Sequence, residues 1–167
     1  MDSSVGCVSA VGLEEALYVS IDLRTLYFQQ NSIGVEGAVG LGEGLKVNTA
    51  LTTLDLKDNS IGDEGALGLA EALKMNIALT TLHLGQNSIG DKGAVGLAET
   101  LKVNTALTTL YLWSNSIGDE GVRALKDALC VREEVVGMVC SYFEYHGRMA
   151  CPDLSRVFAI ARNMTEN

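Results

Sequence analysis

The chain has 167 residues, of which 47% are hydrophobic and 20% charged, and its formal net charge is -9 at pH 7. This composition is typical of a globular domain and excludes disorder as the main state. The acidity argues against nucleic acid or an anionic membrane as the partner, because both bind clustered Lys and Arg. No signal peptide or membrane-spanning segment is evident, so we expect a cytoplasmic protein.

Residues 1–22 are expected to form the helical half of an incomplete repeat. The motif GLEEAL at residues 12–17 closely resembles GLAEAL at residues 68–73. The second motif lies inside a much more regular region, so the first is interpreted as a further copy that lacks its strand.

Residues 23–134 consist of four copies of a 28-residue unit, at 23–50, 51–78, 79–106 and 107–134. Two of them read LTTLDLKDNSIGDEGALGLAEALKMNIA and LTTLHLGQNSIGDKGAVGLAETLKVNTA. The register continues without insertion or deletion, and each unit opens with the leucine-rich-repeat pattern L-x-x-L-x-L-x-x-N.

Each unit is predicted to hold a strand, a turn and a helix. Alternating leucines predict strands centred near Leu26, Leu54, Leu82 and Leu110. A helix of roughly ten residues follows each, with apolar residues at helical spacing. In the third unit Asp91 is expected to cap the start of its own helix, and Asn104 to close that helix in the left-handed conformation.

Stacked units bury their leucines between a parallel sheet on the concave side and helices on the convex side, which predicts an α/β leucine-rich-repeat solenoid. The asparagine at the ninth position of each unit leaves the strand where backbone groups lose their ladder partners. We expect these side chains to form a structural ladder between neighbouring turns, rather than an exposed ligand-binding array. They are Asn31, Asn59, Asn87 and Asn115.

The 28-residue period and the sequence I-G-D-E-G-A before the helix resemble the ribonuclease-inhibitor-like class of leucine-rich repeats. That class occurs in ribonuclease inhibitor, in the sensor regions of NOD-like receptors, in Ran GTPase-activating proteins and in some Roco-type GTPases. The resemblance covers residues 12 to about 130 and implies protein recognition, possibly as part of a receptor-like or adaptor protein. It leaves activation of a small GTPase as the alternative function.

A binding surface is predicted from differences among the four units. Side chains at the fifth, seventh and eighth positions change in chemical character, whereas most other positions are alike. The fifth and seventh alternate with the core leucines, so they face the concave surface. The predicted partner-binding residues are Tyr27, Gln29, Gln30, Asp55, Lys57, Asp58, His83, Gln86, Tyr111, Trp113 and Ser114. Neutral drift at solvated positions is the alternative interpretation. Gly85 is expected to leave a hollow across which Trp113 leans toward Lys57, with the indole largely open.

Catalysis, metal binding and a cofactor are not expected. Asp55 and His83 could mimic a base and its orienting group, but no nucleophile accompanies them in the same rows. The glycines of GLGEG at 40–44 fall on small helix positions rather than in a phosphate-binding loop. The four cysteines have no zinc-ligand spacing; they are Cys7, Cys130, Cys140 and Cys151.

Residues 135–167 no longer follow the repeat. Apolar residues between 135 and 151 are sufficient to cover the last core, and 153–163 can form a final helix. We interpret this segment as a C-terminal cap, with a degenerate tail as the alternative.

Overall fold

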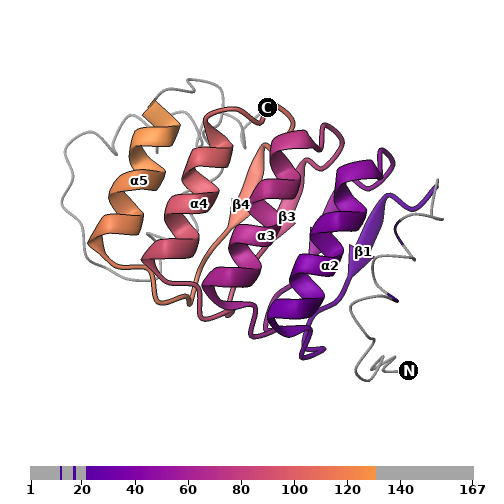
Figure 1. Cartoon of the computed structure of the whole chain (residues 1–167), viewed down its shortest axis with the longest axis horizontal. Helices are drawn as coiled ribbons and strands as arrows, with labels where there is room; N and C mark the ends of the chain where they lie inside the picture. The colour runs from indigo at the N-terminus through magenta and orange to yellow at the C-terminus, as the bar shows by residue number, and fades with distance from the viewer. Residues whose placement is uncertain (1–11, 13–16, 18–21, 131–167) are drawn as a thin grey trace, which may run out of the picture.

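The computed structural model describes residues 12, 17 and 22–130. Within them, four parallel strands form one sheet in the order β1-β2-β3-β4 (Figure 1). The strands are β1 (Thr25–Tyr27), β2 (Thr53–Asp55), β3 (Thr81–His83) and β4 (Thr109–Tyr111). Leu26 pairs with Leu54, and Leu82 pairs with Leu110 and Leu54. The predicted α/β leucine-rich-repeat solenoid is therefore confirmed.

One helix follows each strand, and the four helices lie side by side in a layer that covers one face of the sheet (Figure 1). They are α2 (Gly34–Val47), α3 (Gly62–Met75), α4 (Asp91–Leu101) and α5 (Asp119–Cys130). With 14, 14, 11 and 12 residues, all are longer than the predicted ten.

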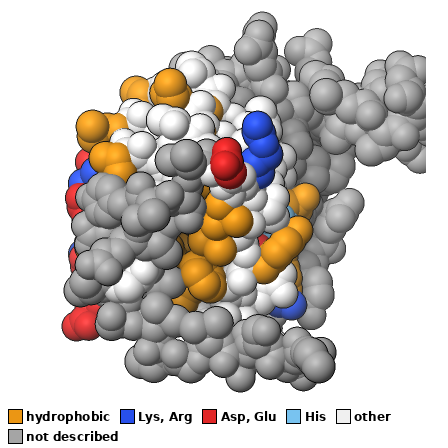
Figure 2. Space-filling model, turned by 90° about the vertical axis from the view of Figure 1, so that its right-hand side faces the viewer, with side chains coloured by type: hydrophobic (Ala, Val, Ile, Leu, Met, Phe, Trp, Pro, Cys, Tyr) orange, Lys and Arg blue, Asp and Glu red, His pale blue; other side chains and the backbone are white. Residues whose placement is uncertain are grey.

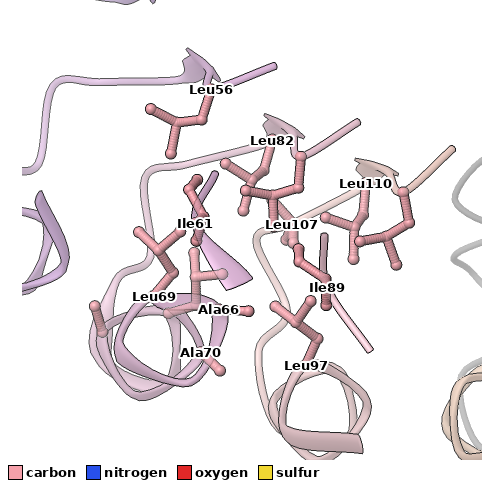
Figure 3. Close-up of a cluster of buried hydrophobic side chains, with 14 of the residues drawn as sticks. Leu56, Ile61, Ala66, Leu69, Ala70, Leu82, Ile89, Leu97, Leu107 and Leu110 are labelled. Atoms are coloured by element: carbon pink, nitrogen blue, oxygen red, sulfur yellow. The ribbon is translucent and has the colours of Figure 1, made fainter. Parts of the chain in front are cut away.

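The core lies between the sheet and the helices. Leu54 and Leu82 are 0% exposed. In the close-up, leucines of neighbouring strands point toward Leu69 of α3 and Leu97 of α4 (Figure 3). At the open end of the solenoid, formed by β1 and α2, hydrophobic side chains reach the surface (Figure 2). Repeats in the middle therefore have a core on both sides.

The ninth-position asparagines bond to the preceding repeat. Asn87 donates from Nδ2 to the carbonyl oxygens of Leu56 (2.8 Å) and Gly85 (3.0 Å). Its Oδ1 accepts from the backbone N–H groups of Asn59 (3.0 Å) and Ile61 (3.3 Å). Asn87 is fully buried. Asn59 and Asn115 make equivalent bonds one repeat away. Each turn is thereby joined to its neighbour by a side chain.

A second asparagine series lies at the ends of the helices, and it corrects the prediction for Asn104. This residue does not adopt a positive φ. Its Nδ2 donates to the carbonyls of Leu73 (2.5 Å) and Asn76 (2.9 Å) in the preceding repeat. Its Oδ1 accepts from the N–H groups of Ala106 and Leu107. The side chain is buried, and Asn48 and Asn76 occupy the same position in their repeats. The residue ties repeats together, which a left-handed cap would not do.

The capping role predicted for Asp91 is also corrected. The N-cap of α4 is Gly90, and no side chain of that residue bonds to the helix. Asp91 instead accepts from the N–H groups of Gly118 (2.7 Å) and Gly121 (2.9 Å) at the start of α5. Asp63 contacts Gly90 and Gly93 in the same way. Each carboxylate therefore caps the helix of the next repeat, because stacking brings that helix start within reach.

The first repeat has Val35 where the next two have Asp63 and Asp91. Gly62, the glycine that this position would cap, has a φ of +63° and donates to the carbonyl of Asn87 at 2.8 Å. Gly90 does not have a positive φ and donates to a carboxylate instead. A left-handed conformation costs glycine little. The carboxylate thus correlates with which conformation the turn adopts.

The predicted cap at 135–167, the half repeat at 1–22 and three of the four cysteines lie outside the described residues, except for isolated positions 12 and 17. In the part of the chain that is described, no helix is long and apolar enough to cross a membrane.

Candidate protein-binding face

The fifth-position residues end the four strands and are neighbours in the sheet. Tyr27 pairs with Asp55, Asp55 with His83, and His83 with Tyr111. Because side chains alternate along a strand, these four point away from the buried leucines beside them. The seventh-position residues continue the same face. We call this surface the sheet face; besides the fifth-position residues it contains Gln29, Lys57, Gly85 and Trp113.

Trp113 lies in a notch formed by a glycine. A Cβ atom placed on Gly85 would come within 2.7 Å of the indole Cε2 and 2.9 Å of Nε1. The indole therefore rests directly on the backbone of the neighbouring repeat. Lys57, one repeat further, places its Nζ 4.9 Å from the centroid of the Trp113 ring. An ammonium over an indole face at this distance is a cation–π contact. Three repeats thus hold one aromatic side chain in place.

The expectation that the indole is largely open is wrong, because Trp113 is only partly exposed. Gly85 covers one part of the ring and Lys57 lies over it. Tyr27 is the open aromatic residue of the sheet face, with 68% of its surface exposed. The side chain that offers apolar area at the centre of the face is therefore already ordered.

Asp55 is 5% exposed and is held by its neighbours. Its carboxylate accepts hydrogen bonds from the side-chain amide of Gln29 and from the N–H of Lys57, the latter at 3.0 Å. The Nδ1 of His83 lies 3.9 Å from Asp55 Oδ2. Protonation of His83 would turn this contact into an ion pair. Asp55 was expected as an open polar edge, but it is a buried anchor for the residues around it.

His83 also contacts the next strand. Its ring centroid is 4.1 Å from that of Tyr111, and the two ring planes are tilted by 38°. Aromatic pairs at this separation attract each other beyond their area burial. Asp55, His83, Tyr111 and Trp113 therefore form a connected, preorganised cluster across β2, β3 and β4.

The eighth-position residues lie in the turns beyond the strands and not in the pleated sheet. All four have a positive φ between 52° and 58°, a conformation that non-glycine residues rarely adopt. Gln30 donates to the Asp58 carboxylate at 3.3 Å, linking the first two turns. Alternation alone could not place these side chains, because it ends where the strand ends. The four residues are Gln30, Asp58, Gln86 and Ser114.

The comparison of repeats missed one row of the sheet face. Thr25, Thr53, Thr81 and Thr109 pair with one another in the sheet and lie two residues before the variable fifth position. They share its face, because strand side chains have a period of two. All four repeats carry Thr here, so a search for variable positions passes over them. The period-two pattern itself was the signal that would have found them.

Comparisons with known proteins agree with this architecture. The leucine-rich-repeat family pattern matches residues 47–70, 76–98 and 103–126, so the chain contains leucine-rich repeats. No curated protein sequence matches the chain.

Two solved structures share the fold. One is titled "Leiomodin-1 Actin-Binding Site 2 (ABS2)", with a TM-score of 0.71, 20% identity, and coverage of 92% of this chain and 88% of that one. The other is the tropomodulin C-terminal domain of Caenorhabditis elegans, with a TM-score of 0.70, 16% identity, and coverage of 95% and 98%. At these identities the likeness establishes the fold alone, and it does not single out the ribonuclease-inhibitor-like subtype.

Proposed function

We propose that this chain is a non-catalytic, cytoplasmic protein-recognition module that binds its partner through the sheet face. The observation that carries the proposal is the ordered cluster of Trp113, Tyr111 and His83. Aromatic side chains dominate protein interfaces, especially where neighbouring groups hold them in one conformation before binding. Here Gly85 and Lys57 fix the indole, so little side-chain entropy is left to lose when a partner arrives.

The partner that suits this face is another protein. The exposed Tyr27 and the partly exposed Trp113 provide apolar area, and the surrounding Gln, Thr and Asp side chains provide a polar rim. A nucleic acid would meet few cations, because Lys57 is already engaged over the indole. A receptor-like or adaptor role remains part of the proposal.

Both solved neighbours come from proteins of the actin cytoskeleton, as far as the first title states an actin-binding site. Actin is therefore a defined probe for this chain, although the likeness supports the fold and not the partner. Neither title describes a GTPase regulator, so activation of a small GTPase has no support here.

The test is a comparative pull-down from extract of the source cell, with actin as one of the proteins quantified. The wild-type chain is compared with Trp113→Ala and with Glu71→Ala, whose side chain is exposed on the outer face of α3. We expect specific proteins to be retained by the wild type and by Glu71→Ala, and lost with Trp113→Ala. The proposal is wrong if retention survives Trp113→Ala and disappears with Glu71→Ala, or if no protein is retained above a blank column.

A further inference from the structure

A second surface lies on the edge of the solenoid where the helices end. Four large hydrophobic side chains are exposed there: Val47 by 53%, Met75 by 65%, Ile77 by 81% and Val103 by 61%. Scattered exposed apolar residues are ordinary, but a contiguous group marks an interaction site more often. We call these four residues the apolar rim.

The buried asparagines fix these side chains in their outward position. Asn76 points inward and bonds to the carbonyls of Leu45 (2.6 Å) and Asn48 (2.9 Å). Met75 and Ile77 flank it in the chain and are left on the outside. Val47 precedes Asn48 and Val103 precedes Asn104 in the same way. The exposure of the rim is thus a consequence of the helix-end ladder and recurs in every described repeat that has one.

The rim is a regular row. Val47, Met75 and Val103 occupy one position in three successive repeats, and their helices pack directly on one another. Packed helices lie about 8–10 Å apart, so the three side chains are evenly spaced with Met75 in the middle. A row with a central member matches a second copy of itself turned by 180°. Val47 then faces Val103 of the other copy, and Met75 lies on the axis.

Charge makes this edge suitable for contact with a like molecule. The lysine before each row member is paired with a glutamate of its own helix turn: Lys46 with Glu43 (2.6 Å), Lys74 with Glu71 (2.5 Å) and Lys102 with Glu99 (2.5 Å). The edge is therefore locally neutral in a chain of net charge -9. The opposite ends of the helices are acidic and would repel a second copy; they carry Glu36, Asp63, Glu64, Asp91, Asp119 and Glu120.

The two-fold arrangement also separates like charges. The lysines belong to the helix side of the row, whereas Ile77 and its equivalents Thr49 and Thr105 lie on the side that leads to the strands. A 180° rotation places the lysines of one copy opposite Ile77 and the threonines of the other. Lysine stems readily cover apolar surface while their ammonium groups stay in water.

We propose that the apolar rim is the interface of an antiparallel homodimer, with Met75 at the two-fold axis. An isologous contact of this kind is the commonest symmetric assembly. The interface is small, because stable complexes use about 20–30 residues from each partner. We therefore expect a dissociation constant on the order of 10⁻⁴ M. The sheet face is not part of this contact, so the dimer is independent of the function proposed above.

The test is sedimentation equilibrium of the full chain at concentrations from about 10 μM to about 1 mM, which bracket that constant. We expect a monomer–dimer equilibrium in the wild type. Met75→Asp and Ile77→Asp should each weaken it at least about tenfold, because the two-fold axis introduces each carboxylate twice. Tyr27→Asp is the matched control: it adds the same charge to an exposed side chain on the sheet face and should leave the equilibrium unchanged.

Three results would overturn the proposal. The first is a monomer throughout the concentration range. The second is a dimer that Tyr27→Asp disrupts and Met75→Asp does not, which would assign self-association to the sheet face. The third is a monomer whose unfolding midpoint falls in Met75→Asp, which would show that the rim is covered within one molecule. Thermal unfolding of each variant separates the third result from simple dissociation.

Discussion

Replacing Asn87 by alanine tests whether the asparagine ladder holds the repeats together. The side chain is fully buried and makes four hydrogen bonds to backbone groups, two as donor and two as acceptor. Its loss leaves the N–H groups of Asn59 and Ile61 without this acceptor. A buried polar group left without a partner costs about 1–3 kcal/mol. Two such groups predict a loss of about 2–5 kcal/mol in the free energy of unfolding.

Asn31→Ala is the matched control, because it removes the same side chain from the edge of the solenoid. Asn31 is partly exposed, and its Nδ2 donates to the carbonyl of Gln29 at 2.8 Å. Water can replace that bond, so we expect a loss below about 1 kcal/mol. Urea denaturation followed by circular dichroism measures both variants. Equal losses, or a loss below about 1 kcal/mol for Asn87→Ala, would refute the assignment of the ladder as a main source of cohesion.

Three further changes test other parts of the structure. Gly85→Ala should expel the indole of Trp113, the single tryptophan of the chain, and shift its fluorescence to longer wavelength; an unchanged spectrum would show that the notch is not occupied in solution. Val35→Asp should supply the carboxylate that Gly62 lacks and raise the free energy of unfolding by about 0.5–1.5 kcal/mol, measured in urea, whereas a neutral or destabilising effect would argue against capping between repeats. Leu82→Ala should lower that free energy by about 2–5 kcal/mol through lost burial and a cavity, and a loss below about 1 kcal/mol would contradict the central place of Leu82 in the core.

The sequence predicted the strands and the stacking because those features depend on a period that continues without interruption. A leucine repeated every 28 residues can be buried only if neighbouring units align, so Leu54 and Leu82 had one consistent place. The position of Trp113 above Gly85 also followed from the residues, since a missing side chain in one strand leaves room for a large one in the next.

The contacts between repeats were harder to predict. Asp91 and Asn104 fit the rules for capping their own helix, and those rules consider one helix at a time. In a solenoid the next helix start and the previous carbonyls lie equally near, and the side chains bond there instead. The burial of Asp55 has a similar origin, because Gln29 and Lys57 surround it from two repeats. Such contacts require the three-dimensional stacking, which no single segment encodes.

The measurement that tests partner binding through the sheet face most directly is fluorine NMR of the chain labelled with 5-fluorotryptophan. The chain has one tryptophan, so the label gives one resonance, from Trp113, and an unlabelled partner is silent. The partner recovered by the wild-type chain is titrated into this sample, and sedimentation of the same mixture confirms that a complex forms. We predict a saturable change in chemical shift, because the partner contacts the indole or the Lys57 that covers it. A complex that sediments as one species while the chemical shift stays constant would contradict recognition through the sheet face.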